Sequence, residues 1–290
     1  MAVALPLLNG LAYAAFLFLL SAGLNLIFGV MRVVNFAHGS LAMIGAYVVF
    51  TAVGSISGQF WVGLVVGSLV MLVLGMALER GLFRFMYGRE ELYQILLTYG
   101  LVLIAEDAVK IIWGRAYKQL GFPVPFAGPI HMGQVLFPSY YLAMMGVAVL
   151  VALLLWFFLY RTKLGAVVRA ASADREMTEA LGINVGLLSS MLFGIGTALA
   201  AVAGALILPI QSVSPGFGLE VVIGAFIVVV VGGLGSIWGA LIGSVAIGVM
   251  RSFGIMLVPD FELSLVYLVM AVILIVRPWG LLGAPPVGRH

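Results

Sequence analysis

The sequence predicts an all-α, polytopic membrane protein with about eight or nine transmembrane helices, one or two of them broken or re-entrant. Of its 290 residues, 64% are hydrophobic and only 9% are charged, whereas soluble domains are about 45–50% apolar and about 25% charged. The 37 glycines and 11 prolines favour helices that pack closely and break locally, because small residues let helix backbones approach in lipid. Cysteine is absent, which excludes disulfides, thiolate metal sites and cysteine nucleophiles.

Nine apolar segments approach the length of about 20 residues that crosses the hydrocarbon core. They are residues 5–29, 37–53, 60–78, 92–113, 140–160, 186–209, 219–231, 237–257 and 261–276. The first lacks the basic start of a secretory signal and exceeds its usual apolar core of about 7–15 residues, so we expect a retained helix. The segments 37–53 and 219–231 are short, and either can be a half-helix, which lipid tolerates only where the backbone is buried in protein or lines a cavity.

Basic residues predict the orientation of these segments. The connection 161–185 carries seven charged side chains, namely Arg161, Lys163, Arg169, Asp174, Arg175, Glu176 and Glu179. If it is cytoplasmic, the same face also receives Arg32, Arg80, Arg84, Arg89, Arg277 and Arg289, and only Lys110, Arg115, Lys118 and Arg251 lie outside. The positive-inside rule favours this arrangement. We therefore predict an external amino terminus, a cytoplasmic carboxyl terminus, and an ordered external cap in the proline-containing segment 114–139.

Signals for a short helix lie within the connection 161–185. Ser172 can cap a helix from Ala173 to Leu181, acids at its start suit the helix dipole, and Gly182 suits the position after its end. Such a helix would present small and apolar side chains to a partner groove, and these are Ala173, Met177, Ala180 and Leu181. The alternative is a solvated connection without a partner.

The stretch from Asn35 to Gly39 predicts a helix that starts inside the membrane. Asn35 is a good cap, and the amide groups and positive dipole end of such a helix hold carboxylates in transporters with broken helices. We predict that this start faces a translocation path. The alternative is that Asn35 and His38 are interfacial residues beside Arg32, with His38 hydrogen-bonded to a neighbouring helix. Gln94 and Thr98 can line the same path or bond a neighbour.

A glycine cluster, Gly232-Gly-Leu-Gly-Ser236, precedes another apolar segment. It can be a second helix break that matches Gly39-Ser40 in an inverted repeat, or it can serve tight helix crossing. No Lys followed by Ser or Thr accompanies it, so a nucleotide-binding loop is excluded.

Other polar residues give weaker signals. Glu106 and Asp107 suggest a proton relay because intramembrane charges are costly, but Lys110 is within pairing distance on a helix, and we favour local pairing. Glu220 can cap its helix or meet a substrate ammonium group. The three histidines, His38, His131 and His290, form no recognisable metal or catalytic set, so an enzyme is not predicted.

Three motifs together resemble a known family. The run Arg169-Ala-Ala-Ser-Ala-Asp174, followed by Ala180-Leu-Gly182-Ile183, is similar to the cytoplasmic coupling loop of the permease subunits of branched-chain amino acid ABC transporters. Gly23-Leu-Asn25 through Asn35-Phe36-Ala37-His38-Gly39 is similar to their amino-terminal signature, and residues 232–240 are similar to their glycine motif. The motifs occur in family order across nearly the whole chain, which resembles the shorter, LivH-type permease.

This resemblance implies a single transmembrane permease domain over residues 1–290 in the cytoplasmic membrane of a bacterium or archaeon. Implied partners are a second homologous permease, two ATPase subunits that use ATP and Mg²⁺, an extracytoplasmic binding protein and membrane lipid. No cofactor on this chain and no nucleic acid are expected. The predicted path residues are Asn25, Asn35, Phe36, His38, Gly39, Gln94 and Thr98, and the predicted coupling residues are Arg169, Ala173, Asp174, Glu176, Met177, Ala180 and Gly182.

The implied substrates are branched-chain amino acids, while related small carboxylates and amides such as urea remain open. The alternative function is an ion-coupled secondary transporter or channel for small polar solutes. That alternative needs coupling residues within the bilayer, and Glu106 and Asp107 are its only candidates.

Overall fold

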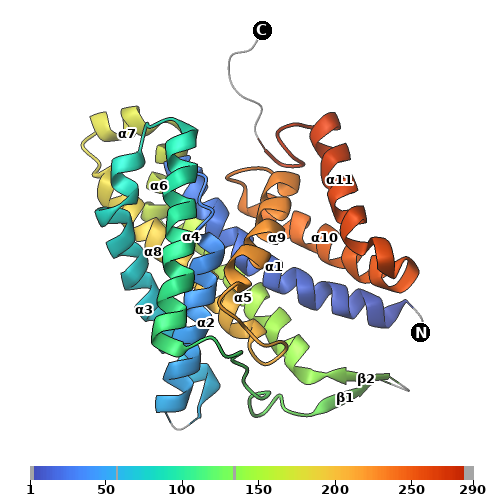
Figure 1. The fold of residues 1–290 in the computed structure, drawn as a ribbon. Coiled ribbons are helices and arrows are strands. Elements are labelled where there is room, and N and C mark those ends of the chain that lie inside the picture. Colours follow the sequence, from blue (N-terminus) through green and yellow to red (C-terminus); the bar gives the residue numbers. More distant parts are fainter. Residues whose placement is uncertain (1–2, 57, 133–134, 284–290) are drawn as a thin grey trace.

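A computed structural model describes residues 3–56, 58–132 and 135–283, so Arg289 and His290 lie outside the described residues. Each of the nine predicted segments forms a helix (Figure 1). They are α1 (Ala4–Met31), α2 (His38–Ser55), α3 (Phe60–Gly81), α4 (Glu91–Trp113), α5 (Ser139–Arg161), α8 (Val185–Ile207), α9 (Phe217–Gly232), α10 (Ile237–Leu257) and α11 (Glu262–Val276). Within the described ranges, six helices are long and apolar enough to cross a membrane, whereas α9 and α11 are shorter. The all-α, polytopic class is confirmed.

The charged connection contains two helices, α6 (Lys163–Ala173) and α7 (Arg175–Ala180), so the single predicted helix from Ala173 to Leu181 is wrong. Asp174 leaves the helical conformation, with φ −144° and ψ 104°, and its carboxylate accepts a hydrogen bond from the Met177 amide at 2.9 Å. Asp174 is therefore the cap of α7. The predicted cap, Ser172, instead donates its hydroxyl proton to a carbonyl of α1. Gly182 follows α7 with φ +82°, as predicted.

Two halves of the chain pack as an inverted repeat. The first half comprises α1, α2, α3, the 3₁₀ helix η1 (Phe83–Met86) and α4, and the second comprises α8, α9, α10, the 3₁₀ helix η2 (Pro259–Phe261) and α11. Helices α1, α2, α3 and α4 correspond to α8, α9, α10 and α11, and the contacts of one half recur in the other. The contact of α1 with α10 matches that of α8 with α3, and the contact of α2 with α4 matches that of α9 with α11. Likewise, α3 contacts η1 and α10 contacts η2. Since α1 ends near α6 while α8 begins near α7, corresponding helices run in opposite directions.

Small residues bring the central helices into close contact. A Cβ atom added to Gly23 of α1 would lie 2.6 Å from the Gly196 carbonyl oxygen of α8, and one added to Gly45 of α2 would lie 2.5 Å from Ala201 Cβ of α8. Because apolar side chains gain little by leaving lipid for protein, such packing is a main source of helix association in membranes. Helices α1, α2 and α8 form the buried centre, and α3, α5 and α10 expose most of their length.

The end opposite α7 carries a β-hairpin, which was not predicted (Figure 1). Strands β1 (Pro129–Met132) and β2 (Val135–Pro138) are antiparallel, with Pro129 opposite Pro138. The preceding loop is held to the segment after α8, because Lys118 and Val213 exchange backbone hydrogen bonds of 3.0 and 2.8 Å. The segment 114–139 is thus tied to the helical body.

Candidate substrate path and coupling surface

Helix α2 begins beside the middle of α1. The Nε2 atom of His38, the first residue of α2, lies 3.0 Å from the Leu20 carbonyl oxygen. Leu20 precedes the last residue of α1, Met31, by 11 residues, which is about 16 Å of helix. The hydrocarbon core is about 30 Å thick, so residues 32–37 turn back along α1 and α2 starts deep in the membrane, as predicted.

Asn35 does not cap α2. The cap position is Ala37, and no side chain bonds the first turn of this helix. Asn35 is fully buried, and neither its Oδ1 nor its Nδ2 has a hydrogen-bond partner in the part of the chain described. A buried polar group without a partner costs about 1–3 kcal/mol. This amide is therefore free to bind a ligand, or a protein group in another conformation.

His38 and Ser40 leave two further polar atoms without partners. The carbonyl of Leu20 can only accept, so the His38 proton is on Nε2 and Nδ1 is an acceptor. Within the described ranges neither His38 Nδ1 nor Ser40 Oγ is hydrogen-bonded, and both residues are buried. The predicted hydrogen bond of His38 to a neighbouring helix is present, whereas the interfacial position in that alternative does not agree with a helix that starts beside the middle of α1. The ring still presents a free acceptor.

The start of α2 crosses the start of α9. A Cβ atom added to Gly39 would lie 2.7 Å from Val222 Cβ, and one added to Gly218 would lie 2.8 Å from Ser40 Cα. Phe36 packs on Phe226 of α9 with ring centroids 4.8 Å apart. The two halves of the repeat thus bring two helix starts together inside the membrane, and their close contact leaves no passage between them.

The glycine cluster is not the counterpart of Gly39-Ser40, contrary to the predicted match. It connects α9 to α10, and the inverted repeat matches it with the turn between α2 and α3. Gly233 and Gly235 have φ of +110° and +79°, which glycine adopts without strain. The tight-crossing interpretation is confirmed, because a Cβ atom added to Gly232 would lie 3.0 Å from the Ala240 amide nitrogen of α10.

Asn25 fastens this glycine loop to α1. Its Nδ2 donates to the Ser236 carbonyl and its Oδ1 accepts from the Gly235 amide, both at 2.9 Å. It also lines a cavity of about 550 Å³ together with Arg32 and Arg169. Both side-chain groups of Asn25 are therefore engaged by protein, and its structural role is to hold the loop beside this cavity.

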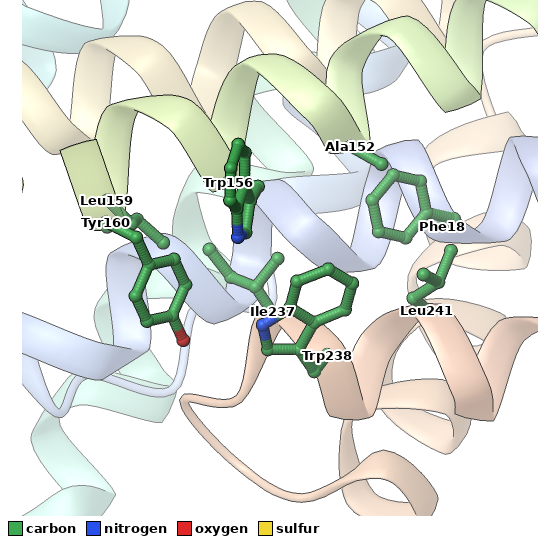
Figure 2. A pocket seen from close by; sticks show the side chains of 8 residues that line it. All are labelled: Phe18, Ala152, Trp156, Leu159, Tyr160, Ile237, Trp238 and Leu241. Atoms are coloured by element: carbon green, nitrogen blue, oxygen red, sulfur yellow. The ribbon is translucent and has the colours of Figure 1, made fainter.

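A narrow apolar cleft continues from this cavity between α5 and α10. Figure 2 shows Trp156 and Trp238 at its centre, with Phe18 of α1 towards one end. The cleft shares Tyr160 and Trp238 with the cavity of Asn25. Polar groups thus surround the cavity of Asn25, and aromatic and aliphatic groups line the cleft.

Gln94 and Thr98 are buried, but in the described residues neither side chain forms a hydrogen bond with Asn35, His38 or Ser40. Gln94 Nε2 donates to the Arg89 carbonyl at 3.1 Å, and the Thr98 hydroxyl donates to the Ile95 carbonyl at 3.1 Å. Both bonds remain within α4 and the turn before it. The Gln94 bond ties the first turn of α4 to the preceding turn, whereas the Thr98 bond lies inside the helix, and Gln94 Oε1 has no partner among the described residues.

The face of α7 is open to solvent. Met177 and Leu181 are 59% and 73% exposed, and Ala173 and Ala180 are also exposed. The charged coupling residues Arg169, Asp174 and Glu176 are exposed as well. Large apolar side chains in water favour an interaction surface when they are grouped, so the predicted docking residues are accessible.

Local pairing explains the acids of α4. Lys110 Nζ lies 3.0 Å from Asp107 Oδ1 and 3.8 Å from Glu106 Oε2, which confirms the favoured interpretation. Glu220 is exposed in the first turn of α9. Sequence reasoning missed Glu79, which is fully buried near the end of α3. It directly follows the predicted span 60–78 and precedes Arg80, and this acid at the end of an apolar segment was the signal in the sequence.

An inverted repeat, two helix starts that meet inside the membrane and an exposed charged connection define a polytopic membrane transport protein. The chain belongs to the family described as the branched-chain amino acid transport system permease component, whose sequence profile matches residues 6–277. It is therefore a multi-pass membrane subunit of an ABC transporter in the inner membrane, and not an enzyme.

Several relatives are similar over nearly their whole length. The high-affinity branched-chain amino acid transport system permease protein BraD of Pseudomonas aeruginosa is 30% identical, with 98% of this chain and 96% of the relative covered. The corresponding LivH of Escherichia coli is 28% identical, with 97% and 96% covered. The probable LivH of Methanocaldococcus jannaschii is 29% identical, with 95% and 91% covered. No solved structure is detectably similar to the chain.

Proposed function

We propose that this permease forms one half of the translocation path of an ATP-driven importer for branched-chain amino acids or related small carboxylates and amides. The observation that carries the proposal is the buried amide of Asn35, which has no partner among the described residues and lies beside a helix that starts within the membrane. Helix starts and free amides suit carboxylates. The names of the relatives support branched-chain amino acids as the first substrates to test.

The partners follow from the two ends of the molecule. The importer has two ATPase subunits, which dock at the end of the molecule that carries α7, where Met177 and Leu181 are exposed, and a substrate-binding protein docks at the hairpin end. A second homologous permease completes the path. ATP and Mg²⁺ are bound by the ATPases, and this single-domain chain binds no cofactor. The basic residues near α6 and α7 support a cytoplasmic carboxyl terminus and an external amino terminus.

Transport requires the crossing of α2 and α9 to open. The contact of Gly39 with α9 closes the passage at this level. Closure of the ATPases would press on α7, and rocking of the two halves would separate the helix starts and expose Asn35 and His38 to substrate. The state in which the helix starts are in contact and the state in which they are separated are then favoured by different ligands, as any ligand-driven switch requires.

Reconstitution tests this proposal. The chain is co-expressed with the genes beside its own, purified as a complex, and placed in liposomes with the binding protein. Uptake of labelled leucine is expected only with ATP, while urea and an aromatic carboxylate in parallel assays define the substrate class. Uptake by the chain alone, driven by an ion gradient without ATP, would establish the ion-coupled alternative instead.

A further inference from the structure

The buried carboxyl group of Glu79 joins two helices and a turn. Glu79 lies near the end of α3 and is fully buried. Its Oε1 accepts a hydrogen bond from the Tyr87 hydroxyl, and its Oε2 accepts one from the Ser190 hydroxyl of α8. In the part of the chain described, no Lys or Arg forms an ion pair with it. Buried acids are rare and costly unless paired, so these two hydroxyls hold the group in place.

Tyr87 connects this carboxyl group to α7. It follows η1 and is half-buried, and the guanidinium carbon of Arg175, the first residue of α7, lies 4.7 Å from the centroid of its ring. Arg175 Nε also pairs with Glu179 Oε1 at 3.2 Å, which keeps the guanidinium on α7. Burial, followed by the hydrogen bond to Glu79, raises the pKa of the Tyr87 hydroxyl above its usual range. The hydroxyl therefore stays protonated and remains a donor.

A cavity lies beside this contact, between α7 and the body of the protein. About 340 Å³ of open space lies between α7, the turn after α3 and the start of α8, and Arg84, Tyr87, Arg175 and Asn184 are among its lining residues. The covalent connection from α7 to α8 contains Gly182 with φ +82°. A short connection beside open space can bend, so it transmits force poorly without a second contact.

Helices α3 and α8 are packed closely enough to move together. A Cβ atom added to Gly75 would lie 2.7 Å from Thr197 Cβ, and one added to Gly194 would lie 2.8 Å from the Leu72 carbonyl oxygen. Close packing transmits displacement because the interior has little free volume. Helix α8 in turn packs on α1 and α2, whose contact positions His38.

We propose that Tyr87 is a positioning residue that transmits movement of α7 to α3 and α8, through the Arg175 guanidinium on one side and Glu79 on the other. The proposal rests on the proposed importer function, in which the ATPases press on α7. Loss of the Tyr87 hydroxyl would leave α7 attached to its ATPases while its movement no longer reaches the path.

The test compares Tyr87→Phe with Tyr93→Phe in the complete reconstituted transporter. Tyr87→Phe keeps the ring and its contact with Arg175 but removes the proton donated to Glu79, whereas Tyr93 is an exposed residue of the neighbouring helix. Glu79→Gln is compared with Glu91→Gln, which is exposed. Three quantities are measured for each variant: ATPase subunits recovered per permease, ATP hydrolysed, and leucine taken up.

We expect Tyr87→Phe and Glu79→Gln to recover ATPase subunits normally and to hydrolyse ATP, while leucine uptake per ATP falls about tenfold, which corresponds to ~1.4 kcal/mol. Tyr93→Phe and Glu91→Gln retain the wild-type ratio. A purely structural role would lower thermal stability or yield without changing the ratio, and an unchanged ratio in Tyr87→Phe overturns the proposal. Failure of the wild-type complex to show ATP-dependent uptake would instead refute the importer function.

Discussion

The imidazole of His38 donates from Nε2 to the carbonyl oxygen of Leu20 at 3.0 Å, and this bond holds the start of α2 against the middle of α1. The side chain three residues earlier, Asn35, is buried beside it without a partner in the described structure. The protein thus binds one ring nitrogen of His38, whereas His38 Nδ1 and both polar atoms of the Asn35 amide have no partner among the described residues.

Replacement of Asn35 separates a transport role from a structural one. Asn35→Leu removes an unsatisfied amide at similar volume, and such changes are neutral or stabilising when no partner is lost. We expect an unchanged or higher melting temperature and a fall in uptake of about tenfold or more, equivalent to ~1.4 kcal/mol or more. Asn9→Leu, an exposed amide on α1, is the control. Normal uptake by Asn35→Leu would remove this residue from the path.

The crossing of α2 and α9 depends on Gly39. The Cβ atom in Gly39→Ala would collide with α9, and overpacking of this kind costs about 1–3 kcal/mol. Thermal unfolding in detergent should show a lower melting temperature for this variant. Gly146→Ala on α5 has no atom within 4 Å of the new Cβ and should not lower it. Equal melting temperatures would mean that the helices separate easily at this point.

The exposed face of α7 should bind the ATPases. Met177→Asp places a charge at the centre of this face, where burial in a partner groove would be costly. We expect at least a tenfold lower recovery of ATPase subunits, or ~1.4 kcal/mol, with unchanged permease yield. The control is Lys163→Gln, which changes an exposed side chain at the start of α6. If Met177→Asp still recovers both ATPases and transports normally, α7 is a connection without a docking role.

Membrane orientation can be tested by cysteine labelling without background labelling of this chain, because its sequence contains no cysteine. Tyr117 and Leu181 are equally exposed, each at 73%, and lie in the predicted external and cytoplasmic segments. In cells that express the permease without its ATPases, a membrane-impermeant maleimide should label Tyr117→Cys and not Leu181→Cys while the cells are intact, and cell lysis should make both reactive. The reverse labelling would invert the proposed orientation.

The sequence alone determined the class of protein and the positions of its nine long apolar helices. Each of the nine apolar segments forms a helix as predicted, because the requirement is local: about 20 apolar residues suffice to cross the core, whatever surrounds them. The position of Gly182 after α7 was also predictable, because a left-handed residue at a helix end is a local preference. The three family motifs were recognisable for the same reason, since each is a continuous run of residues.

Only the tertiary structure decided which polar groups have partners. Ser172 failed as a cap because a carbonyl of α1, distant in sequence, accepts its proton. Asn25 holds the glycine loop, Asn35 bonds no group in the described part of the chain, and Glu79 is buried between Tyr87 and Ser190. A hydrogen bond depends on two atoms meeting within about 3 Å. Sequence spacing determines that distance within one helix, whereas between helices only the packing determines it.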